Sequence, residues 1–156
     1  MNKLMIFIAS IVILFLFCCG NEEIPKDDNL ISVYKNNRGI FEQIRSEMCR
    51  SRYYYIRENG TSDPEDIPKK ELDKYYDLLE RIGVKSVSKS TKCNVSFEVW
   101  SEGFVGTNKT KGFILNPSLE GLVVDNLDNK DLIRKKTAFY YKHIEGGWYL
   151  YFYYWV

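Results

Sequence analysis

The sequence predicts an α+β fold, in which N-terminal helices pack on a curved antiparallel sheet of four to six strands. Three observations carry this prediction. Apolar residues recur at spacings of three and four between residues 30 and 82, as in amphipathic helices. From Val84 onward the apolar period changes to two, which is typical of strands. Helices followed by strands favour a segregated α+β architecture, and the length of 156 residues fits one domain.

The first 18 residues have the anatomy of an export signal. Lys3 gives a positive start, and residues 4–17 are apolar except for Ser10. A membrane-spanning helix needs about 20 apolar residues, so this stretch is too short to span and suits a signal peptide. We therefore exclude residues 1–18 from the fold.

The end of this segment resembles a bacterial lipoprotein signal. Leu16 stands three residues before Cys19, as in that family, although Phe17 and Cys18 depart from its small residues. The resemblance implies a lipid such as palmitate on Cys19 (alternatively Cys18). Because Gly20 follows rather than Asp, it also implies anchoring in the outer membrane, facing the periplasm. Ordinary secretion with cleavage near Gly20 and a retained short anchor are the alternatives.

The polar residues 19–29 predict a tether, and residues 30–156 a single domain. A helical pattern begins at Leu30 and continues to Met48, but Asn37 and Gly39 interrupt it. They predict a kink or two shorter helices.

A second helix is expected between Pro68, which suits a first helical turn, and Gly83, which suits an exit. Residues 51–67 contain two turn signals, Asn59-Gly60 and Asp63-Pro64. The second helix has an apolar stripe of five residues: Leu72, Tyr75, Tyr76, Leu79 and Ile82.

Alternating or short apolar segments mark the expected strands. They are residues 84–89, 95–101, 113–115, 122–124, 137–143 and 148–156. This order resembles the cystatin-like or nuclear-transport-factor-like cone, in which a curved sheet wraps a helix. The Trp-Tyr-rich ending is similar to that of small uncharacterised proteobacterial lipoproteins. Neither likeness implies an activity.

Beyond the signal, the cysteines are Cys49 and Cys93. In an exported chain two thiols within reach normally pair, so we expect a disulfide that closes a loop of 44 residues. Two separate buried thiols are the alternative.

Composition narrows the functional classes. Because 22 basic residues are balanced by 21 acidic ones, the chain has no strong positive electrostatic field to attract nucleic acid, and we expect no nucleic-acid partner. The single histidine excludes a multi-histidine metal site, and neither a metal nor a cofactor is expected. Residues 103–110 nearly match a phosphate-binding loop, but Asn108 replaces a required glycine and a strand follows. We therefore expect a hairpin there.

The strongest signal is aromatic. Residues 137–156 contain ten aromatic side chains and form an expected hairpin. His143, Tyr141 and Phe139 are expected to face Leu150, Phe152 and Tyr154 across this hairpin, because facing residues of antiparallel strands share a side. The candidate binding surface is then the opposite face. Packing of the sheet against the two helices, with β-propensity accounting for the aromatics of the outer face, explains the same pattern without a binding role and is the favoured interpretation of these residues. This candidate surface consists of Tyr149, Tyr151, Tyr153 and Trp155.

Candidate catalytic groups are few. His143 is expected to be a partly buried structural residue, and Glu98 with Glu102 a pair of solvated strand ends rather than a glycosidase acid pair. The sequence therefore favours a non-enzymatic envelope lipoprotein that binds a protein or envelope component, as an immunity protein or inhibitor does. The alternative is a pocket that binds or hydrolyses a small apolar or glycan ligand, with His143 at the site, and a purely structural envelope protein is a third possibility.

Overall fold

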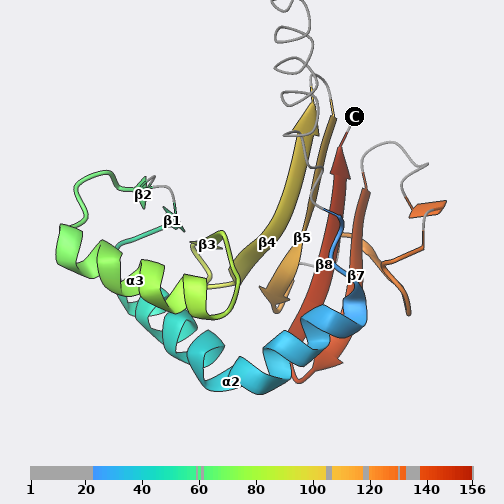
Figure 1. The fold of residues 1–156 in the computed structure, drawn as a ribbon, viewed down its shortest axis with the longest axis horizontal. Helices are drawn as coiled ribbons and strands as arrows, with labels where there is room; N and C mark the ends of the chain where they lie inside the picture. Colours follow the sequence, from blue (N-terminus) through green and yellow to red (C-terminus); the bar gives the residue numbers. More distant parts are fainter. Residues whose placement is uncertain are drawn as a thin grey trace, which may run out of the picture.

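The structure, a computed structural model, describes residues 23–58, 60, 62–104, 107–117, 120–129, 131–132 and 138–155. Residues 1–22, with the predicted signal peptide, Cys18 and Cys19, lie outside these ranges. The described chain is α+β, with two helices packed on one face of an open, mostly antiparallel sheet (Figure 1). None of the helices in the described part is both long and apolar enough to cross a membrane.

Helix α2 (Asp27–Arg50) contains the predicted kink, at Asn37, whose φ of −122° is non-helical. The helix begins three residues before Leu30, so residues 27–29 belong to the domain and not to the tether. Asp27 and Asp28 favour this early start, because acidic residues in a first turn interact well with the helix dipole.

Helix α3 (Lys69–Arg81) confirms the second helical prediction. Pro68 precedes its first residue, and Gly83 follows it with a φ of +63°, a conformation that glycine adopts without strain. Tyr75 and Leu79 from the predicted stripe are buried.

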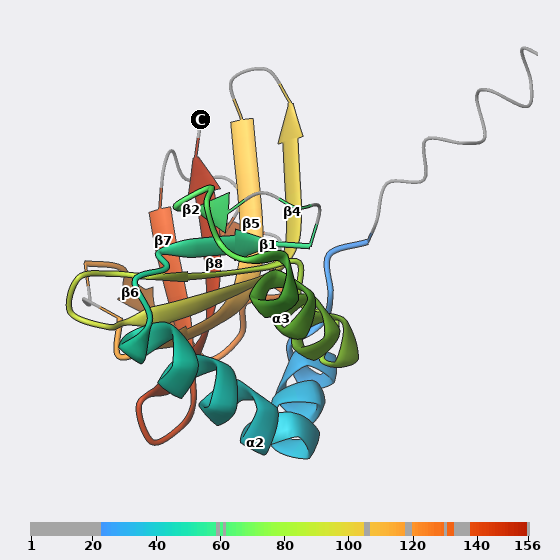
Figure 2. The ribbon, with the colours of Figure 1, turned by 90° about the vertical axis from the view of Figure 1, so that its left-hand side faces the viewer.

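The sheet contains eight strands among the described residues, in the order β2-β1-β3-β4-β5-β8-β7-β6. Neighbours are antiparallel except β6 and β7. Figure 2 shows β1 running across the direction of β4 and β5, so the sheet twists strongly between its ends. The strands are β1 (Tyr55–Arg57), β2 (Ser62–Asp63), β3 (Ser86–Lys89), β4 (Val95–Phe104), β5 (Thr107–Leu115), β6 (Leu122–Val123), β7 (Ala138–Glu145) and β8 (Trp148–Trp155).

The prediction of four to six strands was therefore too low. The two additional strands, β1 and β2, have three and two residues and lie in the segment with the turn signals. They are too short to show alternation, and they contain no apolar run such as the one that marked the equally short β6, so the sequence pattern did not mark them. The likeness to a cystatin-like or nuclear-transport-factor-like cone stays a prediction.

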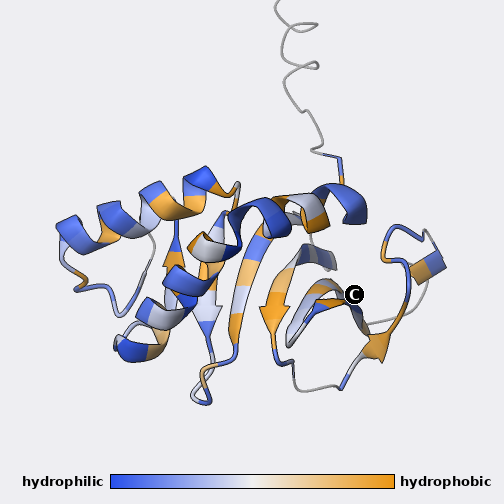
Figure 3. Ribbon diagram, turned by 90° about the horizontal axis from the view of Figure 1, so that it is seen from below, coloured by the Kyte–Doolittle hydropathy of each residue, from blue (hydrophilic) through white to orange (hydrophobic). Residues whose placement is uncertain are grey.

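The core lies between the helices and one face of the sheet. One row of paired residues crosses this face from β1 to β8, and every member has 0 % exposure. Phe41 of α2 packs on this row, with its ring centroid 5.0 Å from that of Phe97 and 4.8 Å from that of Phe113. Both helices alternate hydrophilic and hydrophobic segments (Figure 3), as expected for helices with one buried side. The row consists of Ile56, Val87, Phe97, Phe113 and Leu150.

The predicted disulfide is confirmed. Cys49 in the last turn of α2 is bonded to Cys93 in the turn before β4, with the Cα atoms 5.5 Å apart. This bond joins the end of the helix to the sheet.

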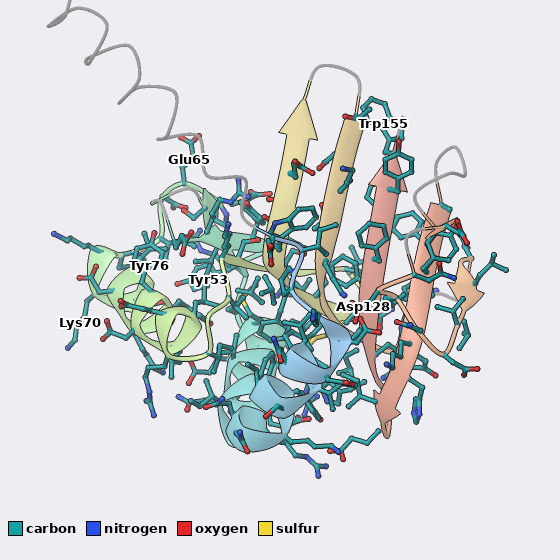
Figure 4. The ribbon with its side chains drawn as sticks, turned by 45° about the vertical axis from the view of Figure 1, so that its right-hand side comes forward. Tyr53, Glu65, Lys70, Tyr76, Asp128 and Trp155 are labelled. Carbon is teal, nitrogen blue, oxygen red and sulfur yellow. A yellow bond between two sulfur atoms is a disulfide. The ribbon has the colours of Figure 1, made fainter. Side chains whose placement is uncertain are left out.

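A buried ion cluster fixes the beginning of α2. The Lys111 ammonium, with 0 % side-chain exposure, lies 2.7 Å from the Asp27 carboxylate and 2.6 Å from that of Asp128. The Asp27 carboxylate also lies 3.1 Å from the Lys142 ammonium and accepts a hydrogen bond from the backbone N–H of Leu127. Figure 4 shows Asp128 beside the first turn of the helix. The cluster therefore holds α2 against strands β5 and β7.

Candidate binding surface

The sheet face that looks away from the helices is defined by strand register. Because side chains alternate along a strand, the residues next to the buried row point to the opposite side. We call this side the helix-free face. Its three rows are Arg57-Ser86-Glu98-Gly112-Tyr151-Tyr141, Tyr55-Ser88-Ser96-Ile114-Tyr149-His143 and Ser101-Thr110-Tyr153-Phe139.

The two halves of this face differ in chemistry. Across β1, β3 and β4 it is polar: Arg57 lies 2.6 Å from Glu98, which also accepts a hydrogen bond from Ser101 at 2.9 Å. The Ser88 and Ser96 hydroxyls bond to each other at 2.8 Å. Across β8 and β7 it is aromatic.

A cavity of about 210 Å³ lies where the two halves meet, and we call it the aromatic cavity. The Phe139 and Tyr153 rings stack with their centroids 4.2 Å apart, and the Tyr141 ring lies 6.4 Å from that of Phe139. Its lining consists of Ser96, Thr110, Ile114, Phe139, Tyr141, Tyr151 and Tyr153.

Gly112 gives Tyr151 its place over the sheet. A Cβ atom at position 112 would collide with the Phe97 carbonyl oxygen and would lie 3.1 Å from Cε1 of Tyr151. A glycine inside a strand often marks such a close approach. The ring of Tyr151 can therefore lie directly above the backbone of β5.

Burial and nearby carboxylates act on the tyrosines of the cavity. Burial, and secondarily the negative charge of Glu98, raises the pKa of Tyr151 well above its usual value. Burial together with the charge of Glu120 raises the pKa of Tyr141. Both hydroxyls therefore stay neutral at physiological pH, and both rings lie near negative charge.

The structure distributes the predicted surface residues unequally. Tyr149, Tyr151 and Tyr153 all lie on the helix-free face, but of these three Tyr151 and Tyr153 line the aromatic cavity. Trp155 lies at the free end of β8 and is 48 % exposed (Figure 4).

The expected register of the last hairpin was wrong by one residue. A bulge between His143 and Glu145 shifts the pairing, so that His143 lies opposite Tyr149 instead of Leu150. The same shift moves Phe139 and Tyr141 onto the helix-free face, where they complete the aromatic cavity. The repeated aromatics of β7 predicted a strand, but nothing in them marked the bulge.

His143 was expected to be partly buried, and it is exposed instead. Its Nε2 atom lies 2.9 Å from the Gly146 carbonyl oxygen, and its ring packs edge-on against Tyr149 at 5.0 Å. It is not part of the cavity lining.

A second bulge, between Glu98 and Trp100, separates the two candidate acids. Even-numbered positions of an uninterrupted strand share a face, but the bulge places Glu102 on the side opposite Glu98. Glu102 pairs with Lys109 at 2.9 Å. The two carboxylates do not form an acid pair. Of the segment 103–110, residues 103–104 end β4 and residues 107–110 begin the antiparallel strand β5, in agreement with the expected hairpin.

A larger cleft, of about 500 Å³, lies between α2 and α3. Two contacts cross it: Lys74 lies 2.7 Å from Glu47, and the hydroxyl of Tyr53, which is labelled in Figure 4, donates to Glu71. These contacts join the two helices, so we assign the cleft a structural role. Among the residues that the structure describes, no three His, Cys, Asp or Glu side chains are grouped to hold a metal ion.

Comparison with known proteins gives no match to any family model, curated protein or solved structure.

Proposed function

We propose that this chain is a non-enzymatic binding module of the bacterial cell envelope, and that its helix-free face binds a protein partner. The aromatic cavity carries this proposal. Tyr and Phe side chains offer large apolar area, and in an interface such side chains commonly supply most of the binding energy. Here they surround a hollow on a sheet face that neither helix covers.

The size of the cavity favours an anchored side chain over a whole small molecule. Pockets for drug-sized ligands measure about 300–1,000 Å³. The aromatic cavity, at about 210 Å³, suits one inserted side chain within a larger contact. An immunity- or inhibitor-like partner, such as an envelope-targeting toxin or hydrolase, would supply that contact.

The alternative, a hydrolytic or ligand-binding pocket served by His143, has less support. His143 is exposed and engaged with Gly146 and Tyr149 outside the cavity. A general base must come within about 3 Å of the proton that it removes.

The anchor in this proposal is a lipid on Cys19, with Cys18 as the alternative, in the outer membrane. Metabolic labelling with palmitate tests it. Cys19→Ala should abolish labelling and Cys18→Ala should retain it. The reverse result would assign the lipid to Cys18, and labelling in the double variant would contradict lipidation of this segment.

The binding role is tested by purifying the tagged full-length chain gently from membranes and recording its native mass spectrum. We expect a second protein in stoichiometric amount. A bare acylated monomer, or a complex with a small molecule alone, would contradict a protein partner.

The partner complex then allows a matched comparison of variants. Replacing Tyr151 and Tyr153 with Ala should weaken partner binding more than it weakens folding, as measured by Tm. Tyr54→Ala is the control, since Tyr54 is 46 % exposed and lies outside the aromatic cavity. Equal loss of folding and binding in the double variant would argue that these tyrosines act only in packing.

A further inference from the structure

The aromatic cavity combines four aromatic rings with a lining that carries no formal charge. The face of an aromatic ring is electron-rich and attracts a cation placed within about 6 Å of its centroid. Phe139 and Tyr141 present nearly parallel rings 6.4 Å apart, tilted by 12°. Such rings can contact a flat or rounded cationic group from more than one side.

Carboxylates outside the lining add to this negative environment. Glu98 lies in the same register row as Tyr151, with Gly112 between them, although it shares its charge with Arg57. Glu120 precedes Gly121, where an added Cβ would lie 2.6 Å from Cε2 of Tyr141. One carboxylate therefore lies toward each side of the cavity. The charges of Glu98 and Glu120 contribute to the raised pKa values of Tyr151 and Tyr141, which agrees with this placement.

We infer that the aromatic cavity is a cage for an organic cation, and that the partner supplies it as a lysine or arginine side chain. The inference rests on the proposed function, because it specifies the chemistry by which that partner is recognised. Charge complementarity selects this occupant: the rings and the nearby carboxylates attract positive charge.

A sugar ring would need other groups. Recognition of a sugar by hydrogen bonds favours planar side chains that present two acceptors (Asp), two donors (Arg) or one of each (Asn). The lining offers isolated hydroxyls, from Ser96, Thr110 and the tyrosines. An apolar side chain would fit by size, but it would gain nothing from the carboxylates.

The test compares probes that differ only in charge. Aromatic NMR spectra of the full-length chain in detergent micelles, with the disulfide intact, are recorded at low salt with N-acetyl-arginine amide and with neutral N-acetyl-citrulline amide. N-acetyl-lysine amide, phosphocholine and N-acetylglucosamine form the other arms. We expect arginine or lysine to shift the Tyr and Phe ring signals of the cavity, at least about fivefold more tightly than citrulline, and salt to weaken this binding.

Variants locate the site. Tyr153→Leu removes a ring while retaining apolar volume and should weaken arginine binding about fivefold to tenfold. Trp155→Leu, on the same strand but outside the cavity, should leave it unchanged. Glu120→Gln should weaken it about twofold, and Glu102→Gln, which alters a carboxylate on the opposite side, should not. Unchanged thermal melting of each variant shows that folding is intact.

Several outcomes would overturn the inference. They are equal binding of arginine and citrulline, no shift up to the solubility limit of the cationic probes, or preference for the sugar. Binding of phosphocholine without arginine or lysine would instead identify a lipid headgroup as the occupant. If the cationic probes fail but the tyrosine variants still lose the protein partner, the cage is wrong and the binding module stands. If the cationic probes bind but no protein partner is found, the aromatic cavity does bind cations and the proposal of a protein partner is wrong.

Discussion

The two faces of the sheet use neighbouring residues of the same strands for different purposes. On the helix-covered face, the row through Phe97 and Phe113 is fully buried and packs against Phe41. One residue along each strand, the row through Glu98 and Tyr151 faces no helix and mixes an ion pair with the half-buried Tyr151 and the buried Tyr141. Aromatic content alone therefore does not separate core from candidate site. What separates them is whether another layer covers the ring.

The largest expected difference between the faces is in stability. Phe41→Ala should lower the free energy of unfolding by about 3–5 kcal/mol, because it leaves a cavity among rings that cannot move inward. Phe139→Ala on the helix-free face should cost no more than about 1 kcal/mol, since Phe139 is already 43 % exposed. Urea unfolding followed by circular dichroism measures both. Equal costs would mean that the helix-free face is also part of the core.

The disulfide should stabilise the fold through the helix-covered face, without affecting partner binding at the helix-free face. Replacing both Cys49 and Cys93 with Ser should cost about 2–4 kcal/mol, chiefly because the unfolded chain regains the freedom of a loop of 44 residues. Below its lower melting temperature the double variant should still bind the partner with unchanged affinity. Loss of binding in the folded variant would show that the helix side transmits strain to the aromatic cavity.

The ion cluster predicts how the covered face responds to acid. Burial alone would raise the pKa of Asp27, but contacts with Lys111, Leu127 and Lys142 outweigh it and lower the pKa below its usual value. The stabilisation is therefore complete above the pKa of the unfolded carboxyl, about 3.9, and is lost as pH falls through the lower folded value.

Asp27→Asn removes this contribution. We expect it to cost about 1–3 kcal/mol at neutral pH and to flatten the fall of stability below about pH 4. Denaturant titrations between pH 2 and 7 compare the variant with the wild type. If the stability of the variant falls as steeply below pH 4 as that of the wild type, other carboxylates determine the response to acid. Asp128→Asn is a useful comparison, because Asp128 is the more exposed partner of Lys111.

Much of the fold followed from periodicity, whereas the site did not. Long repeats predicted both helices, an interruption of the first repeat predicted the kink at Asn37, and alternating or short apolar segments predicted six of the strands. The two bulges, near His143 and between Glu98 and Trp100, decide which side chains share a face, and each depends on a single additional residue. Because one residue of register reverses every side chain of a strand, the sequence located the aromatic surface on β8 but assigned its partners on β7 to the wrong side.

The smallest expected effect concerns His143, and it tests where the site ends. Its contacts are one hydrogen bond with the Gly146 carbonyl and one edge-on ring contact with Tyr149, both at the surface. His143→Ala should therefore lower stability by no more than about 1 kcal/mol and change partner affinity by less than about twofold. Tyr149→Leu is the matched variant, since Tyr149 faces the same side without lining the cavity. If either substitution removes the partner while melting is unchanged, the contact extends past the aromatic cavity to the hairpin turn. Binding energy would then be spread along β7 and β8 and would not be concentrated at one anchor.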